Sequence, residues 1–329
     1  MPDEILNEKF SLKVIYLLAK MDHMSEEVLS SFYSIAGFKP GIQSWISFIS
    51  KLVLSLGLLF TVTGVIFFFA YNWSELHKFA KLSIVGGAIL ASTIIALFSE
   101  LNKFHAKLSL LAVAVFTGSL LAVFGQIYQT GANAYDLFLN WAILITGIVL
   151  ISNFKPLWFL WLTLINTAII LFAGQILWRW IDPFVFISLF IVNTIALIIY
   201  EYFSYRKNPK FDSRWLPRII GFAIIFSMTV AGIVGIITEF EDYGHAICLL
   251  LALGSYVTAF FFYSRKVYDL SSIAVSCVCI IAMVFTVILK ARNFDTASIF
   301  FIGGFIIVGL TITSAFILIK INKAWKTQI

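Results

Sequence analysis

The chain has 329 residues, of which 61% are hydrophobic and only 12% are charged. A soluble domain carries about 25% charged residues, so this composition excludes a water-soluble globular protein and places the chain among membrane proteins. The net charge of +6 does not indicate a nucleic-acid partner, because the basic residues stand in short groups between apolar runs. There they act as topology signals and as contacts for anionic lipid head groups, so the predicted partner is the lipid bilayer.

Residues 1–49 form the first predicted part of the chain, a short cytoplasmic helical segment. Acidic and basic residues are mixed along it, and no apolar core precedes a small-residue cleavage site, so the pattern does not fit a signal peptide. Its spacing of apolar residues fits two short amphipathic helices, the second capped by Ser25 and ended by Pro40. Residues 1–45 are the expected contact site for a cytoplasmic protein partner.

Ten apolar runs follow, and most approach the ~20 residues that a helix needs to cross about 30 Å of hydrocarbon. Each must be helical, because lipid offers no hydrogen-bond partner for an exposed backbone group. The runs lie at 52–71, 79–98, 107–128, 136–151, 156–177, 183–200, 216–237, 244–263, 271–289 and 297–319. The fourth run is the shortest and has the least sharply marked ends. The sequence therefore predicts an all-α fold, a polytopic integral membrane helix bundle of about ten transmembrane helices.

The distribution of Lys and Arg predicts the orientation of these spans. With a cytoplasmic N-terminus, 18 of the 23 basic residues fall on the cytoplasmic side and five on the outer side. This asymmetry follows the positive-inside rule, whereas a missed or invented span would have scrambled it. Both termini are therefore predicted to be cytoplasmic.

The predicted membrane interior lacks the ionisable residues and motifs that ion coupling, catalysis and metal binding commonly use. No Asp, Glu, Lys or Arg lies in the middle third of any span, which weighs against a proton-driven pump because such pumps use ionisable residues at depth. The sequence has no P-loop, no zinc-protease motif and no nucleophile elbow, and its His and Cys residues form no ligand cluster. It therefore predicts no catalytic residue, no metal site and no cofactor, and an enzyme is not the favoured interpretation.

Two amides stand out in the membrane interior. Asn166 and Asn193 fall near the centres of two consecutive, antiparallel spans. One prediction is that their side chains hydrogen-bond across the helix pair, which is typically worth about 0.6–2 kcal/mol. The alternative is that each amide bonds the backbone of its own helix.

Small residues recur at every fourth position in two spans. They are Ser83, Gly87 and Ala91 in the second span, and Ala114, Gly118 and Ala122 in the third. Because small residues at this spacing let helix backbones approach closely, we expect the second and third spans to pack tightly together.

Polar and aromatic residues concentrate at the predicted outer ends of the first four spans. These ten residues, called the outer cluster below, are Asn72, Trp73, Gln126, Tyr128, Gln129, Asn133, Tyr135, Asp136, Asn140 and Trp141. Amides beside aromatic rings can hydrogen-bond a sugar, a lipid head group or a peptide and stack on its apolar face, so the outer cluster is the candidate ligand-binding site. Gly125 and Gly131 permit a helix break or a close turn there. The alternative is an ordinary interfacial belt with helix caps.

The same stretch carries a resemblance to a known family. Residues 64–73 (GVIFFFAYNW) and 125–132 (GQIYQTGA) resemble the bacterial membrane protein family called domain of unknown function 2157, over roughly residues 5–155. The resemblance implies a multi-pass protein of the bacterial cytoplasmic (inner) membrane, and it brings no established activity. It divides the membrane part into a family-like four-span region at 50–151 and a six-span region at 152–329.

Three classes of function stay open at this point. The first is a carrier or flippase for a polar or lipid-linked solute, with the outer cluster as part of its path. The second is an envelope assembly, ligand-binding or sensor protein without transport or catalysis. The third is a membrane-embedded transferase, which would need an acid or base at the outer face, where Asp136, Asp182 and His245 are the candidates.

Overall fold

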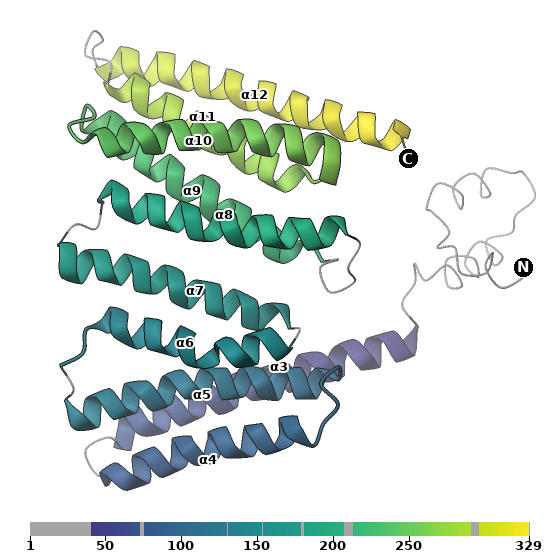
Figure 1. The fold of residues 1–329 in the computed structure, drawn as a ribbon. Helices are drawn as coiled ribbons and strands as arrows, with labels where there is room; N and C mark the ends of the chain where they lie inside the picture. Colours follow the sequence, from purple (N-terminus) through teal and green to yellow (C-terminus); the bar gives the residue numbers. More distant parts are fainter. Residues whose placement is uncertain are drawn as a thin grey trace, which may run out of the picture. The chain divides into compact units, whose positions relative to one another are not determined.

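The computed structural model describes residues 41–72, 76–129, 131–152, 154–178, 181–206, 213–290 and 296–328. These residues form α3 (Ile42–Asn72), α4 (Lys78–Leu97), α5 (Phe104–Tyr128), α6 (Ala134–Ser152), α7 (Lys155–Phe172), α8 (Pro183–Tyr205), α9 (Trp215–Ile237), α10 (Tyr243–Phe262), α11 (Leu270–Lys290) and α12 (Thr296–Gln328) (Figure 1). Two π-helical turns, η2 (Ala173–Leu177) and η4 (Tyr263–Val267), extend α7 and α10. The helices predicted before Pro40 lie outside the described residues.

Ten of the described helices are long and apolar enough to cross a membrane. They follow the ten predicted runs in order, so the prediction of an all-α, multi-span membrane protein is confirmed. The largest difference is at the first span, where the helix begins at Ile42 and not at 52. The carbonyl of Gly41 accepts hydrogen bonds from the backbone N–H groups of Ser44 and Trp45, so the helix starts directly after Gly41.

The chain forms two compact units. Unit 1 comprises Met1–Lys81 and Gly87–Val113, and unit 2 comprises Leu82–Gly86 and Ala114–Ile329. Within unit 1, only 6% of the most apolar stretch of α3 is buried. Its apolar side chains therefore face outward, as expected of a helix in lipid, whose chains are as apolar as the side chains themselves.

Unit 2 is built around α9. In this unit α6 packs against α7, α7 against α8, and α9 against α8, α10 and α11, while α12 packs on α11 (Figure 1). Half of the most apolar stretch of α9 is buried, the largest share among the ten spans of the described residues. Small residues permit this burial: a Cβ added at Gly232 would lie 2.5 Å from the Cε of Met283 on α11.

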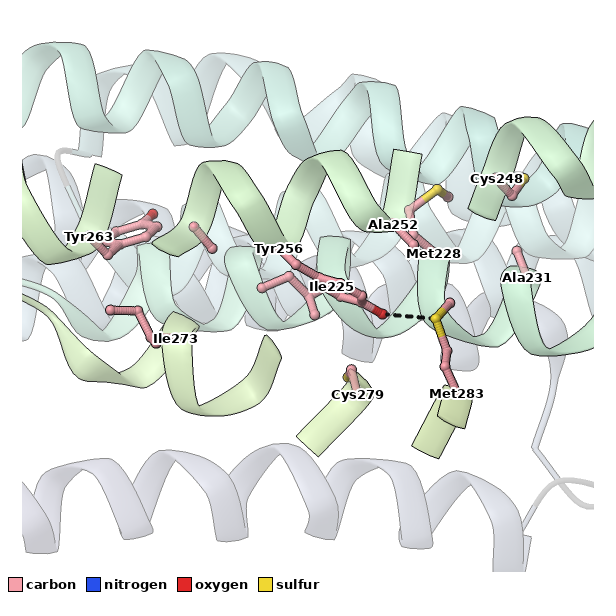
Figure 2. Close-up of a cluster of buried hydrophobic side chains, with 11 residues drawn as sticks. Ile225, Met228, Ala231, Cys248, Ala252, Tyr256, Tyr263, Ile273, Cys279 and Met283 are labelled. Carbon is pink, nitrogen blue, oxygen red and sulfur yellow. Dashed lines mark hydrogen bonds between the residues drawn. The ribbon is translucent and has the colours of Figure 1, made fainter. Parts of the chain in front are cut away.

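Polar contacts inside the apolar core of unit 2 join three helices, and Figure 2 shows the one between Tyr256 and Met283. The hydroxyl groups of Thr229 on α9 and Tyr256 on α10 lie 2.6 Å apart. The Tyr256 hydroxyl also donates to the Sδ of Met283 on α11 over 3.6 Å. Because an unpaired hydroxyl in hydrocarbon is costly, this chain of contacts favours one arrangement of α9, α10 and α11 over others.

Gly118, one of the small residues of the third span, packs against α6. A Cβ added at Gly118 would lie 2.3 Å from the Trp141 ring on α6, whereas nothing lies within 4 Å of the corresponding position at Gly87. The Trp141 indole N–H donates to the carbonyl of Ala114 over 2.7 Å. At Gly118 the stripe therefore makes room for a large side chain of α6.

Candidate functional site

Eight of the ten residues of the outer cluster lie at the end of α5, after it and at the start of α6. The helix α5 continues unbroken through Gly125 to Tyr128. The chain then reverses through Gln129 and Gly131, whose φ angles of 45° and 65° lie in the left-handed region. Gly131 thus has a positive φ, as the freedom of a glycine permits, whereas α5 shows no helix break at Gly125. Asn72 ends α3 in unit 1, and Trp73 lies outside the described residues.

Three members of the outer cluster are tied to the protein at the start of α6. The Asn133 backbone N–H donates to the Asp136 carboxylate over 3.1 Å, which satisfies a donor before the first turn of the helix. The Tyr135 backbone N–H donates to the side-chain oxygen of Gln175 in η2 over 3.2 Å. The Tyr135 ring packs edge-on against Phe172 at a centroid distance of 5.2 Å. Gln175 thus belongs to this region, although no sequence pattern indicated it.

The remaining described members of the outer cluster divide into two kinds. Trp141 points into unit 2, where it packs on Gly118. The side chains of Gln126, Tyr128, Gln129, Asn133 and Asn140 are exposed. The described members of the outer cluster therefore do not form a single set of inward-pointing side chains. Five of them are exposed, whereas Trp141 packs inside unit 2.

A groove of about 500 Å³ lies elsewhere, between α7, α8 and α9. Its walls come from α7 between Lys155 and Ile165, from α8 between Val192 and Phe203, and from Leu216 and Ile220 of α9. Apart from Lys155 at one end and Tyr200, the lining residues are apolar or aromatic. Its volume lies within the range of about 300–1,000 Å³ that ligand pockets occupy. We call it the α7–α9 groove.

The predicted amide pair adjoins one end of the α7–α9 groove. The Asn166 side-chain N–H donates to the Asn193 oxygen over 3.1 Å, and Asn193 donates back to Asn166 over 2.9 Å. Asn193 also donates to the Leu189 carbonyl of its own helix over 2.7 Å. The cross-helix prediction is therefore confirmed, and the alternative of a bond to the residue's own backbone holds in addition for Asn193. Ile165 and Val192, which line the groove, directly precede the two amides.

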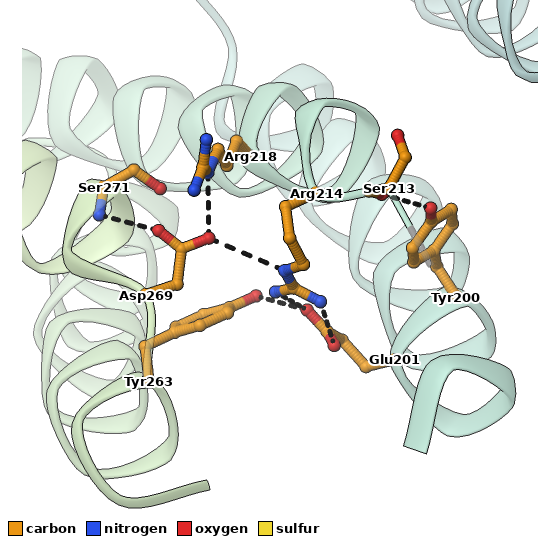
Figure 3. A network of polar contacts seen from close by, with 8 residues as sticks. All are labelled: Tyr200, Glu201, Ser213, Arg214, Arg218, Tyr263, Asp269 and Ser271. Carbon is orange, nitrogen blue, oxygen red and sulfur yellow. Dashed lines mark hydrogen bonds and ion pairs between the residues drawn. The ribbon is translucent and has the colours of Figure 1, made fainter. Parts of the chain in front are cut away.

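Near the C-terminal end of α8, charged residues and one tyrosine from four elements form a network that we call the charge network (Figure 3). The Arg214 guanidinium donates two hydrogen bonds to Glu201 of α8, at 2.9 and 2.7 Å. Glu201 also accepts a hydrogen bond from the Tyr263 hydroxyl over 3.1 Å. Asp269 lies 3.6 Å from Arg214 and accepts a hydrogen bond from Arg218 over 2.9 Å. The charge network thus joins α8, α9, η4 and the start of α11.

Burial makes this charge network matter energetically. Glu201 and Asp269 are only 9% and 5% exposed. Burial alone would raise the pKa of Asp269, but hydrogen bonds from Arg218 and from Ser271 outweigh it and hold that pKa below its usual value. Burial alone would lower the pKa of Arg214, but its hydrogen bonds and charge interaction with Glu201 raise that pKa instead. Asp269 and Arg214 are therefore charged at neutral pH.

The structure gives hydrogen-bond partners to all three candidates for acid or base chemistry, which are Asp136, Asp182 and His245. Asp182 caps α8 by accepting the Phe184 backbone N–H over 2.8 Å, and Asp136 accepts the N–H of Asn133. The buried ring of His245 has its Nε2 3.1 Å from the Ile181 carbonyl. No group of three or more His, Cys, Asp or Glu that can hold a metal ion occurs in the described part of the chain.

Residues 20–158 match the model of a protein family described as "Predicted membrane protein (DUF2157)". The resemblance expected at roughly residues 5–155 is therefore confirmed. The match covers α3 to α6 and ends in the first turn of α7, so most of the α7–α9 groove lies beyond it. Neither a curated protein nor a solved structure matches the chain.

Proposed function

We propose that this multi-span membrane protein is a carrier or flippase for a lipid-linked or other amphiphilic solute in the bacterial cytoplasmic membrane. The single observation that carries the proposal is the α7–α9 groove, whose lining runs from Lys155 at a helix end to the residues beside Asn166 and Asn193. These two amides lie at the twelfth and eleventh positions of 23-residue spans, which is the middle of each. The groove therefore offers an amphiphile a route from one membrane face to a polar pair at mid-depth.

Two physical arguments support this function. Polar groups within hydrocarbon are costly, and the amide pair is the kind of site at which a polar group of a solute can find hydrogen-bond partners. Ile195 and Ile199 on the α8 wall are 53% and 50% exposed, so the groove opens sideways, where a solute with an acyl or prenyl chain can enter from the bilayer. The outer cluster is the proposed exit region, because its exposed amides suit a polar head group.

A translocation assay tests the proposal. The purified protein is reconstituted in vesicles that carry a fluorescent lipid, and an impermeant quencher reports how much of the lipid reaches the outer leaflet. The variant Val192→Phe fills the groove and is expected to slow exchange severalfold. The matched control is Val257→Phe, at a position of α10 that is 56% exposed. Exchange no faster than in protein-free vesicles, with several lipid head groups, would contradict a flippase.

The second candidate is an envelope assembly, ligand-binding or sensor protein without transport. The observation that favours it is the set of exposed polar side chains in the outer cluster, which needs no transport path to bind a ligand. Deleting residues 1–45 discriminates between the two candidates. Loss of a copurifying partner, with membrane insertion intact, would support the assembly role for the N-terminal segment.

A further inference from the structure

The length of the α7–α9 groove matches one leaflet of a bilayer. On α7 the lining extends over eleven residues, from Lys155 to Ile165, and on α8 over twelve, from Val192 to Phe203. At a rise of about 1.5 Å per residue, the first and last Cα atoms of each wall are about 15–17 Å apart. This is half of the about 30 Å of hydrocarbon in a bilayer. The groove therefore runs from the membrane surface to the midplane, which is the depth that one acyl chain occupies.

An apolar groove does not by itself select an occupant within a membrane. Lipid chains are as apolar as the side chains that line the groove, so no hydrophobic gain draws one lipid in preference to another. Selection must come from the polar end of the groove. There the groove is lined by Lys155 and, one turn along α7, by Trp158, and both residues are half-buried. Trp at this depth is typical of the head-group level, and Lys binds phosphate as a point charge.

We propose that the α7–α9 groove binds an anionic phospholipid, with one acyl chain along its walls and the phosphate beside the Lys155 amine. This inference deepens the proposed function, on which it rests, by naming the class of amphiphile. The outer edge of the groove is exposed at Ile195, Ile199 and Phe203 of α8, so a lipid enters from its own leaflet without leaving the bilayer. Lys155 lies on the side that the basic residues predict to be cytoplasmic, where anionic lipids attract Lys and Arg.

Native mass spectrometry of the intact protein tests this inference. Phosphatidylglycerol and phosphatidylcholine with identical chains are titrated into the detergent-purified protein, and the affinity ratio of the two lipids is measured. One Lys near an anionic head group changes affinity by about fivefold, so Lys155→Gln is expected to reduce the preference for phosphatidylglycerol by about that factor. Lys155→Arg is expected to retain it. Val192→Phe is expected to weaken binding of both lipids.

The matched control is Lys266→Gln, which removes the same charge at an exposed position in η4, outside the groove. An equal loss of preference with Lys266→Gln and Lys155→Gln would overturn the inference, because it would indicate general surface charge. Displacement of phosphatidylglycerol by excess inorganic phosphate would also overturn it, since the site would then take free phosphate. So would unchanged lipid binding by Val192→Phe in a variant that unfolds at the wild-type temperature.

The outcomes separate this inference from the proposed function. Selective binding without lipid exchange in vesicles would contradict the carrier and leave the lipid site intact. Lipid exchange with the wild-type lipid preference in Lys155→Gln would contradict the lipid site alone.

Discussion

Tyr200 and Glu201 are consecutive residues of α8 whose side chains belong to different environments. Tyr200 lines the α7–α9 groove, whereas the Glu201 carboxylate lies in the charge network and accepts two hydrogen bonds from Arg214. The Tyr200 hydroxyl in turn donates to the carbonyl of Ser213, the residue before Arg214. The charge network therefore holds the groove wall of α8 against the start of α9, and changes in one are expected to affect the other.

We expect Glu201→Ala to lower the free energy of unfolding by about 3 kcal/mol, because it leaves the partly buried Arg214 without its main partner. The double variant Glu201→Met with Arg214→Met should lose less, since it removes both charges. Thermal unfolding in detergent, followed by tryptophan fluorescence, measures both. The control is Glu100→Gln in the exposed pair with Lys103, for which about 0.5 kcal/mol or less is expected. Equal losses at the two sites would contradict the importance of burial.

The charge network also predicts a dependence of stability on pH. The pKa of Asp269 is below its usual value in the folded protein, because Arg218 and Ser271 bond its carboxylate. Its contribution to stability is therefore present above the unfolded-state pKa of about 3.9 and is lost as the pH falls through the folded-state value. Comparing unfolding temperatures of the wild type and Asp269→Asn from pH 6 to pH 3 tests this, and their difference should shrink at the acidic end. A constant difference would count against it.

The hydrogen bonds of the amide pair predict that substituting Asn193 costs more stability than substituting Asn166. Asn193→Leu leaves Asn166 without a partner in the pair, whereas Asn166→Leu leaves Asn193 its bond to Leu189. Each variant should cost about 0.6–2 kcal/mol, with the larger loss for Asn193→Leu. The double variant should cost less than the sum, because no amide is then left unpaired. Thr163→Val is the control, because the exposed Thr163 bonds only the Phe159 carbonyl of its own helix.

Close packing at Gly118 predicts the effect of a single methyl group. In Gly118→Ala the new Cβ would lie 2.3 Å from the Trp141 ring, which its bond to Ala114 holds in place. Overpacking of this kind costs about 1–3 kcal/mol. Gly147→Ala on α6, where nothing lies within 4 Å, should be neutral or slightly stabilising because Ala favours helix. If Trp141→Leu restores the stability of Gly118→Ala, the clash with the indole is its cause.

The predicted orientation is tested by labelling single cysteines in a background without Cys248, Cys277 and Cys279. Positions Glu241 and Lys266 lie at opposite ends of α10 and are both exposed. With cytoplasmic termini, a membrane-impermeant maleimide should label Glu241→Cys in intact cells of a single-membrane host or in spheroplasts. It should label Lys266→Cys only after lysis. The reverse pattern would invert the topology and place the Lys155 end of the groove on the outer side.

The spans and the amide pair were predictable, because each depends on local properties of the sequence. A helix of about 20 apolar residues needs no partner to be recognised. Asn166 and Asn193 stand at equal depth on neighbouring antiparallel spans, so their meeting required only that the two helices turn these faces toward each other.

The α7–α9 groove and the charge network were not predictable in this way. The groove depends on how far the walls of α7 and α8 lie apart, which no periodicity records. The charge network joins Glu201 to Tyr263, 62 positions further along, and Arg218 to Asp269, 51 positions along. In the sequence these charges read as ordinary loop residues at span ends. Gln175 escaped notice because a π-helical turn, which has no clear sequence signature, carries it.

The amide pair also bears on how α7 and α8 enter the membrane during synthesis. A lone Asn in the middle of an apolar helix is a weak point for insertion, because its amide meets hydrocarbon with few partners. The two helices are consecutive, with α7 and its π-helical turn ending at Leu177 and α8 beginning at Pro183. They can therefore leave the insertion machinery as a hairpin whose amides already satisfy each other. The hydrogen bonds between Asn166 and Asn193 in the folded protein would then already form during membrane insertion.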